Sequence, residues 1–357
     1  MKVVQLLTTL SFGDAVGNDT VALKGAIESM GFKTAIYAEN IDARLQKSTA
    51  EPIAKLKELG KDDVIIYHKS TGTDLSFKLD NYKCRKIMIY HNITPSKFFQ
   101  PYNSTAAALT DYGLQGVKYL RNKVDYCLAD SSFNKSNLID MGYTCPIDVR
   151  PILIPFDDYK KKPDEEIIKK YSEDGYTNII FVGRIAPNKK QENIIRAFYQ
   201  YKKINPKSRL ILVGAYSGME NYYERLVKYT KALSLEDDVI FTGHIKFNAI
   251  LAYYKIADVF LCMSEHEGFC VPLVEAMFFD VPIISYDSSA ISDTLGGSGI
   301  LLESNEPLLA AMVIDKLVND SQLREKVIQG QRRRLEDFQY EKIKCIFEKY
   351  LRNFLGK

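Results

Sequence analysis

The stretch Ser264–Met277, SEHEGFCVPLVEAM, holds two glutamates eight residues apart, Glu267 and Glu275. It follows a short apolar run, 258–263, which is typical of a buried parallel strand. Because Pro272 can open a helix in its first turn, we expect Glu267 in a strand-to-helix loop and Glu275 on that first turn. Open α/β sheets bind ligands outside the carboxyl ends of their strands. Both carboxylates are therefore expected at a ligand site.

Taken singly, Glu275 could complement a helix dipole and Glu267 could be an ordinary loop acid. Taken whole, the stretch resembles the E-x7-E signature of retaining glycosyltransferases with the GT-B fold, in particular glycosyltransferase family 4. The resemblance implies an α/β protein with two Rossmann-like, doubly wound domains that face each other across a cleft. It also implies that Glu275 binds the donor ribose and that Glu267 lies by the hydroxyls of the transferred sugar. The donor would further be lined by Gly268, Phe269, Cys270 and Val271.

Strand-like runs alternate with helical patterns along the chain, which indicates βαβ units and parallel sheets. We expect strands over 2–9, 33–38, 63–67, 86–90, 125–129, 146–150, 178–183, 209–214, 238–242, 258–263, 282–285 and 299–302. We expect helices over 18–30, 51–59, 105–121, 131–141, 191–204, 219–233, 246–255, 272–279, 306–319, 321–335 and 339–355.

Two prolines, Pro151 and Pro155, bracket an extended segment that indicates the crossing between two domains. We expect an acceptor-binding domain over 1–150 and a donor-binding domain over 151–338. The resemblance implies that the final helix, within 339–357, packs back on the first domain.

The segment 178–190 is the second informative feature of the chain. Its apolar strand ends at Gly183, where the main chain can approach a ligand closely, and Arg184 and Lys189 follow. Cations at a strand end, next to the start of a helix, favour an anion site. The alternative is that both are surface cations paired with nearby acids. The segment resembles the family's Gly-Arg…Lys diphosphate clamp, which implies that both cations stabilise the leaving diphosphate.

The chain contains no Asp-x-Asp motif that could hold a metal for the diphosphate. Arg184 and Lys189 would then supply the positive charge themselves. We therefore expect a transferase that needs neither a metal nor another cofactor. The resemblance also places contacts to the donor base at His244 and Ile245.

The first half of the chain offers a glycine-containing loop and two histidines. Gly13 and Gly17 open a helix but lack the G-x-G-x-x-G dinucleotide pattern, so the loop suits a sugar or phosphate instead. His68 and His91 both follow apolar strands, and the segment around His91 resembles the family's histidine segment, whose imidazole lies near the donor sugar. We favour His91 as the catalytic histidine, acting by hydrogen bonding and orientation. The candidate acceptor contacts are Asp14, Asn18, His68 and Asn92.

Length, composition and charge limit the classes of protein to which this chain can belong. The 357 residues suit two α/β domains, and 46% hydrophobic content is ordinary for a globular protein. The N-terminal stretch lacks a signal-peptide pattern, and the six cysteines form no C-x-x-C pair, which favours a reducing cytoplasm.

Residues 1–150 carry 19 Lys and Arg against 16 Asp and Glu. This small excess is compatible with peripheral contact to an anionic membrane face. No nucleic-acid module is visible.

Several functions stay open within these limits. The resemblance is strongest to bacterial surface-polysaccharide enzymes, which makes GDP-mannose the first candidate donor and a glycan or lipid-linked glycan the acceptor. A UDP-hexose or UDP-N-acetylhexosamine is the alternative donor. A non-catalytic subunit that binds a nucleotide sugar is the alternative of another class. A phosphorylase is disfavoured because no pyridoxal-phosphate lysine site is found.

Overall fold

The computed structural model describes residues 1–11 and 13–356, which form two compact units. Unit 1 comprises 1–96, 107–156 and 337–357, and unit 2 comprises 97–106 and 157–336. The chain crosses after Phe156, six residues beyond the expected boundary. Unit 2 also takes in the segment 97–106, which the expected 1–150 domain had included. The reason is local packing, because the ring of Tyr102 lies 5.0 Å from that of Tyr222.

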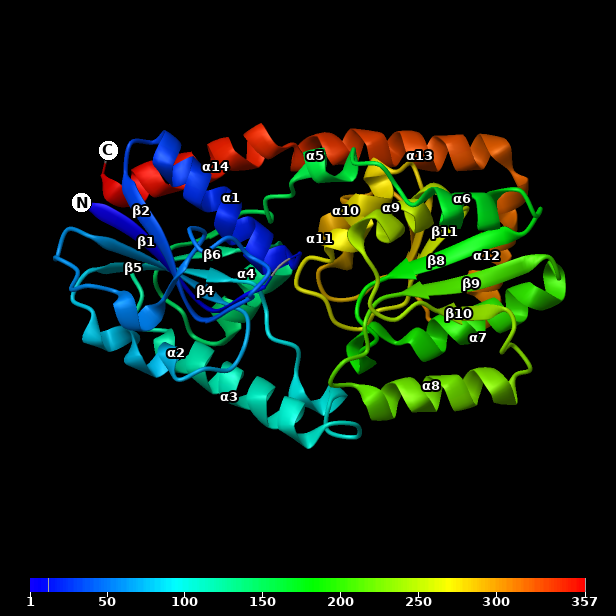
Figure 1. The fold of residues 1–357 in the computed structure, drawn as a ribbon, viewed down its shortest axis with the longest axis horizontal. Helices are drawn as coiled ribbons and strands as arrows, with labels where there is room; N and C mark the ends of the chain where they lie inside the picture. Colours follow the sequence, from blue (N-terminus) through cyan, green and yellow to red (C-terminus); the bar gives the residue numbers. More distant parts are fainter. Residues whose placement is uncertain (12, 357) are drawn as a thin grey trace. The chain divides into compact units, whose positions relative to one another are not determined.

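Unit 1 is built on a seven-stranded parallel sheet in the order β3-β2-β1-β4-β5-β6-β7 (Figure 1). Its strands are β1 (Lys2–Leu10), β2 (Lys33–Ile41), β3 (Glu51–Pro52), β4 (Val64–Lys69), β5 (Arg85–Tyr90), β6 (Tyr126–Ala129) and β7 (Ile147–Val149). The order reverses between β1 and β4, as in doubly wound sheets. The carboxyl ends of β4, β5, β6 and β7 therefore lie side by side at one edge.

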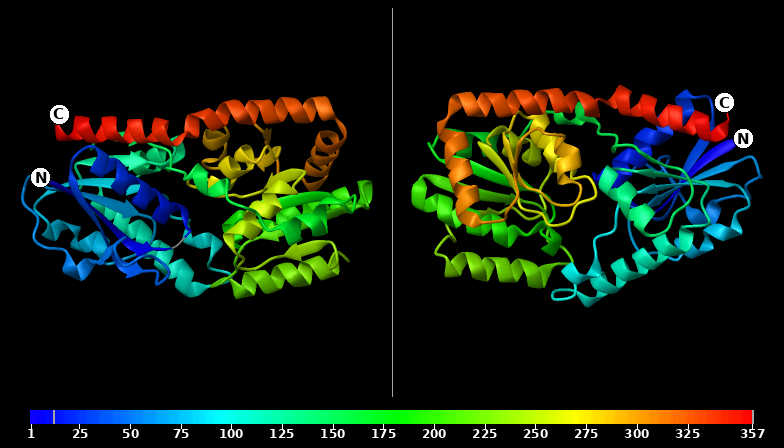
Figure 2. Two further views of the ribbon diagram at one scale, coloured as in Figure 1. Left: turned by 45° about the horizontal axis from the view of Figure 1, so that its top comes forward. Right: turned by 180° about the vertical axis from the view of Figure 1, so that it is seen from behind.

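Alternation along the strands gives this sheet two apolar faces. Val3 packs with α1 (Ala15–Ser29) and α14 (Tyr340–Leu355) on one face. Val4 packs with α3 (Ser104–Leu120) and α4 (Ser132–Asp140) on the other, where the short α2 (Leu75–Lys78) also lies. Figure 2 shows α14, the last helix of the chain, lying along unit 1.

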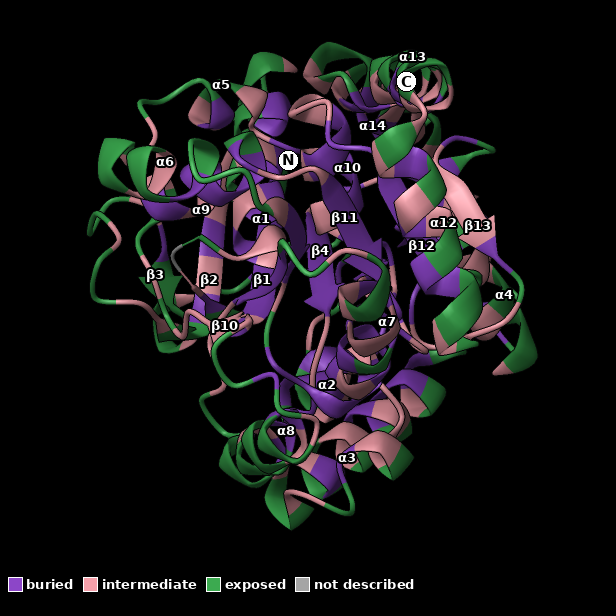
Figure 3. Cartoon of the chain, turned by 90° about the vertical axis from the view of Figure 1, so that its right-hand side faces the viewer, coloured by how far each residue is buried: buried purple, intermediate pink, exposed green. Residues whose placement is uncertain are grey.

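Unit 2 is built on a six-stranded parallel sheet in the order β10-β9-β8-β11-β12-β13. Its strands are β8 (Thr177–Val182), β9 (Ser208–Val213), β10 (Val239–Phe241), β11 (Val259–Cys262), β12 (Ile283–Tyr286) and β13 (Ile300–Leu302). The helices from the crossing onward are α5 (Phe156–Tyr159), α6 (Glu165–Ser172), α7 (Gln191–Ile204), α8 (Glu220–Ala232), α9 (Phe247–Lys255), α10 (Val271–Phe278), α11 (Ile291–Leu295), α12 (Pro307–Asn319) and α13 (Ser321–Leu335). The central strand β11 is buried, whereas the outer side of α8 is exposed (Figure 3).

Most expected elements are confirmed to within a few residues, but the helix expected over 51–59 is wrong. Glu51 and Pro52 form the edge strand β3, which pairs with Tyr37 and Ala38, and only the short 3-10 helix Ile53–Lys55 follows. Pro52 lacks an N–H, which an edge strand tolerates and a helix interior does not. Among the described residues, no helix combines the length and apolar character that a membrane crossing would need.

Candidate active site

In unit 2 the fold brings Lys189 and Glu267 together. Lys189 lies in a 3-10 helix after β8, and Glu267 lies in the loop between β11 and α10. The Nζ atom of Lys189 donates to Oε2 of Glu267 at 2.5 Å, and Glu267 is only 6% exposed. Burial alone would lower the pKa of Lys189, but the Glu267 carboxylate raises it overall. Oε1 of Glu267 is buried and has no hydrogen-bond partner within residues 1–11 and 13–356.

The loop that carries Glu267 is held by two neighbouring loops. The main-chain N–H of Glu267 donates to Oγ of Ser289 at 2.7 Å. On the other side, the N–H of Glu265 donates to the carbonyl of Asn188 at 2.8 Å, and the Asn188 amide donates to the carbonyl of His266 at 2.9 Å. These hydrogen bonds fix the position of the Glu267 carboxylate relative to Lys189.

Glu275 lies on α10, as predicted, and its carboxylate is hydrogen-bonded to two tyrosines. Its Oε1 accepts from the hydroxyl of Tyr159 at 2.9 Å, and its Oε2 accepts from Tyr254 at 2.7 Å. Burial raises the pKa of the Glu275 carboxyl, and the two phenols offset only part of this effect. Neither tyrosine was predicted from the sequence as a partner of Glu275. With 23 tyrosines in the chain, no local signal marks these two.

The end of β8 approaches the end of β9 closely. Gly183 has φ +153° and Gly214 has φ +152°. A β-carbon at Gly214 would lie 2.0 Å from the carbonyl oxygen of Gly183, so this position tolerates only glycine. Arg184 is exposed, and its Nη2 donates to the carbonyl of Ser217 at 3.3 Å. The two predicted cations thus differ in their partners. Lys189 is paired with the Glu267 carboxylate, whereas the Arg184 guanidinium donates to a main-chain carbonyl.

The other predicted donor residues follow β10 and β11, in loops or, for Val271, at the start of α10. Phe269 is buried and its carbonyl accepts from Thr294, while Gly268 and Val271 are partly exposed. Cys270 precedes α10 in a left-handed conformation, with φ +71°. After β10, His244 is exposed and Ile245 is partly buried.

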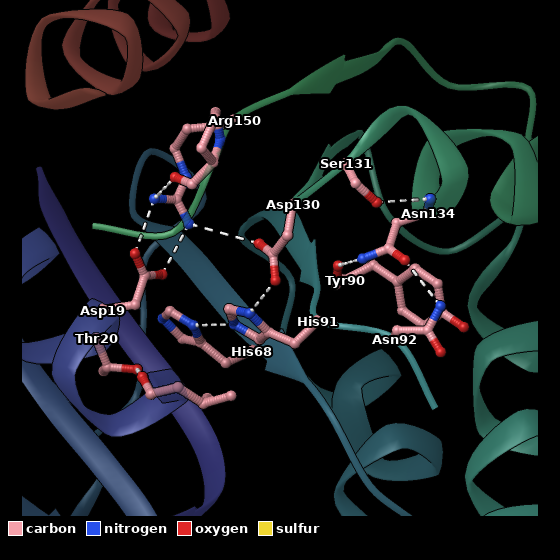
Figure 4. Close-up of polar contacts among 12 residues, drawn as sticks. Asp19, Thr20, His68, Tyr90, His91, Asn92, Asp130, Ser131, Asn134 and Arg150 are labelled. Carbon is pink, nitrogen blue, oxygen red and sulfur yellow. Dashed lines mark hydrogen bonds and ion pairs between the residues drawn. The ribbon is translucent and has the colours of Figure 1, made fainter. Parts of the chain in front are cut away.

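In unit 1 the edge formed by β4, β5, β6 and β7 carries one polar network (Figure 4). Arg150 follows β7 and makes a two-pronged pair with Asp19 of α1, with N–O distances of 2.8 and 2.7 Å. Both side chains are fully buried. Burial would raise the pKa of Asp19, but Arg150 lowers it overall. Arg150 also lies 3.9 Å from Oδ1 of Asp130, which follows β6.

His91 completes this network from the end of β5. Its Nδ1 lies 2.7 Å from Oδ2 of Asp130, and its Nε2 lies 2.9 Å from Nδ1 of His68. His68 Nε2 in turn lies 2.9 Å from Oε1 of Gln5, whose amide nitrogen donates to the carbonyl of Thr20. Figure 4 shows the two imidazoles between Asp19 and Asp130.

Counting donors and acceptors assigns the protons. Because Gln5 presents an oxygen, His68 must donate from Nε2 and accept at Nδ1. With Asp130 ionised, His91 then donates from both ring nitrogens and is an imidazolium. Burial alone would lower the pKa of His91, but the carboxylate of Asp130 raises it overall. Burial holds the pKa of His68 well below its ordinary value, so His68 is neutral.

This network changes what the predicted residues can do. The His91 side chain is 1% exposed, and both of its ring nitrogens have partners within the protein. His68 is fully buried. Asn92, also buried, donates to the side chain of Asn134 at 2.7 Å. Asp130 and Arg150 were missed, although both follow strands in the same way as the predicted histidines.

The glycine-containing loop of unit 1 is organised by its own helix. Asp14 caps α1, and its Oδ1 accepts from the N–H of Gly17 at 2.5 Å. Burial raises the pKa of the Asp14 carboxyl. Asn18 is partly buried on the first turn, and Gly13 is exposed with φ +77°. These residues remain candidates for ligand contact by position.

The proton assignment predicts how His91 titrates. In an NMR titration, we expect the His91 imidazole signals to report a pKa above the ordinary value of about 6.5, and Asp130→Asn to lower it. A raised folded-state pKa stabilises unit 1 fully below about pH 6.5, and this contribution is lost as pH rises through the His91 pKa. Signals that show His91 neutral at pH 6 would contradict the assignment.

Comparison with known proteins shows which family part of the chain is similar to. Residues 163–334 match the family described as glycosyl transferases group 1. The chain is 30% identical over 142 residues to a GDP-mannose-dependent alpha-mannosyltransferase of Mycolicibacterium smegmatis, covering 39% of this chain and 34% of that protein. It is 25% identical over 200 residues to the capsular polysaccharide biosynthesis glycosyltransferase CapM of Staphylococcus aureus, covering 54% and 51%. The chain thus spans about half the length of these relatives or less.

Among solved structures, Anabaena HepE in complex with UDP-glucose matches with a TM-score of 0.77 and 18% identity, over 99% of this chain and 100% of that one. This likeness covers both units and shows the fold. Two parallel α/β units of this kind define the GT-B class. The chain has the GT-B fold, and its segment 163–334 is similar to the family of glycosyl transferases group 1.

Proposed function

We propose that the protein is a retaining hexosyltransferase that moves mannose from GDP-mannose to a glycan or lipid-linked glycan acceptor. The observation that carries the proposal is the buried Lys189–Glu267 pair, whose Glu267 Oε1 has no partner in the described residues. A buried carboxylate oxygen without a donor suits a sugar hydroxyl, which would supply the missing hydrogen bond. The M. smegmatis relative, named a GDP-mannose-dependent enzyme, supports the choice of donor.

The donor would be held by residues of unit 2. Each oxygen of Glu275 accepts one phenol hydrogen bond, and a carboxylate oxygen has a second lone pair for a ribose hydroxyl. Arg184 and Lys189 would stabilise the charge that develops on the leaving diphosphate. Main-chain groups of Gly183 and of the segment 268–271 would contact phosphate and sugar, while His244 and Ile245 would contact the base.

In the proposed reaction the acceptor hydroxyl attacks the sugar on the face from which the diphosphate leaves. The leaving phosphate takes the acceptor proton, so no protein nucleophile or general base is needed. Catalysis then consists of positioning and charge stabilisation. In unit 1 the buried network holds two cations, His91 and Arg150, and two carboxylates. Because the positive and negative charges of this network cancel, it would not stabilise charge on the diphosphate. We therefore assign His91 a positioning role, in which it holds the main chain that follows β5.

The test is a thermal-shift series with GDP, GDP-mannose, UDP, UDP-glucose and UDP-N-acetylglucosamine, each with and without EDTA. A ligand at 100 times its Kd should add about 2.7 kcal/mol of stability. We expect a shift with guanosine ligands that EDTA leaves unchanged and that Glu275→Ala abolishes. The matched control is Glu265→Ala, which removes a neighbouring loop acid paired with Lys190.

Each other outcome is informative. Shifts with uridine ligands alone would replace the donor by a UDP-hexose. A shift that requires magnesium would overturn metal independence. A shift without any donor hydrolysis or transfer would indicate a subunit that binds nucleotide sugars without turning them over.

A further inference from the structure

The thiols of Cys262 and Cys270 lie close to the carboxylate of Glu267, the residue that pairs with Lys189. Cys262 ends β11, and Cys270 precedes α10. The sulfur atoms of both residues and a carboxylate oxygen of Glu267 lie within 4.8 Å of one another. All three residues are buried. Thiolate and carboxylate are ligands that zinc and related soft divalent cations take in proteins.

Cys270 is held in an unusual main-chain conformation. Its φ of +71° lies in the left-handed region, which suits glycine and strains a residue that has a β-carbon. Such strain persists only where the surroundings enforce it, and it gathers at functional sites. The strain here directs a thiol toward Cys262 at a position where glycine would be comfortable.

The described residues contain two groups of side chains that could bind a metal ion, and the two groups differ in whether their ligand atoms already have hydrogen-bond partners. Asp19, His68 and His91 are equally close to one another. In that group, however, both Asp19 oxygens and every ring nitrogen already have partners. In the thiol group, Oε1 of Glu267 is buried and has no hydrogen-bond partner among the described residues. Of the two groups, therefore, the thiol group alone contains a carboxylate oxygen that an incoming cation could take without breaking a hydrogen bond within the part of the chain that the structure describes.

We propose that Cys262, Cys270 and Glu267 bind one soft divalent cation, Zn²⁺ or Cd²⁺. Coordination deprotonates both thiols, and the two protons leave to the solvent. After binding, the charges of the cation and Lys189 balance two thiolates and Glu267, so the occupied site carries no net charge. Burial therefore does not oppose the occupied site through net charge.

The distances among the three ligand atoms are close to those of a metal-bound site. Bonds of about 2.3 Å to sulfur and about 2.1 Å to oxygen place tetrahedral ligand atoms roughly 3.5 Å apart. The observed limit of 4.8 Å needs an inward shift of about 1 Å. Three protein ligands leave a fourth position for water.

A consequence for transfer rests on the proposed function. We assign Oε1 of Glu267 to a hydroxyl of the donor sugar, and the cation would take the same oxygen. Cation and donor would then exclude each other, and the cation would inhibit transfer. The site itself needs only the two thiols and the carboxylate, so cation binding can be tested without any enzymatic activity.

The test is a Cd²⁺ titration of the full chain, without reductant, followed by the ultraviolet thiolate-to-cadmium charge-transfer band. We expect saturation at one equivalent, and loss of the band in Cys262→Ala and in Cys270→Gly. Glycine suits the left-handed conformation, so Cys270→Gly should fold. The matched control is Cys145→Ala, which breaks the other close thiol pair, with sulfurs of Cys127 and Cys145 3.7 Å apart. This variant should keep the band.

The outcomes distinguish the cation site from the donor site. No band in the unsubstituted chain, or a band that persists in Cys270→Gly, would overturn the cation site. A thermal shift with GDP in Cys262→Ala checks that the variant keeps its nucleotide site. A full band in a chain that binds no nucleotide would support the cation site and overturn the donor assignment instead.

Discussion

Replacing Lys189 by methionine should lower the turnover number by about 100- to 1000-fold, the effect of removing one charge-stabilising group from an active site. The physical reason is that Lys189 is the cation nearest to Glu267, which we place beside the transferred sugar. Without it, Arg184 would be the one remaining side-chain cation of the proposed diphosphate clamp. The measurement is the release of nucleoside diphosphate from saturating donor.

A merely structural Lys189 would behave differently. Removing it leaves a buried carboxylate without its cation, which by itself destabilises the fold. The double variant Lys189→Met with Glu267→Gln removes both charges and should recover stability but not turnover. Lys190→Asn is the matched control, because it removes a neighbouring cation while asparagine tolerates the left-handed φ of +51°. Full turnover by correctly folded Lys189→Met would refute the clamp.

Replacing Arg150 by leucine should destabilise unit 1 by about 3–5 kcal/mol, the usual cost of leaving one charge of a buried pair alone. Arg150 and Asp19 are both fully buried, and Asp19 otherwise accepts only from the N–H of Leu153 at 2.8 Å among the hydrogen bonds described. The chain has no tryptophan, so urea unfolding is best followed by far-ultraviolet circular dichroism, with a separate transition allowed for each unit.

An exposed pair provides the comparison. Arg332 and Asp280 are joined at 2.8 Å but are about half exposed, so Arg332→Leu should cost less than about 1 kcal/mol. The double variant Asp19→Leu with Arg150→Met should be more stable than Arg150→Leu, because it buries no unpaired charge. Equal effects of Arg150→Leu and Arg332→Leu would contradict the buried-network account.

Local sequence patterns were sufficient for most of the secondary structure. The apolar run before Ser264 became β11, and Pro272 opened α10 one residue from the expected start. These signals work because strand and helix periodicity act over a few residues. The segment 51–59 failed for a tertiary reason, because Glu51 and Pro52 found a free sheet edge beside Tyr37.

The site was predicted in part. The rule that ligand residues follow parallel strands found His68 and His91, and the same rule applied to β6 and β7 would have found Asp130 and Arg150. It could not give their roles. A histidine at a strand end is a candidate ligand contact in sequence, whereas here both nitrogens of His91 are occupied within the protein.

The sequence by itself determined the alternating α/β order, the two-unit architecture and the spacing that sets Glu267 in a loop and Glu275 on a helix. The tertiary structure alone decided the partnerships. Lys189 meets Glu267 across 78 residues, Tyr159 meets Glu275 across 116, and Arg150 meets Asp19 across 131. Strand order decides which distant side chains meet, and burial then decides their charge. Neither is encoded within the short window over which a sequence pattern acts.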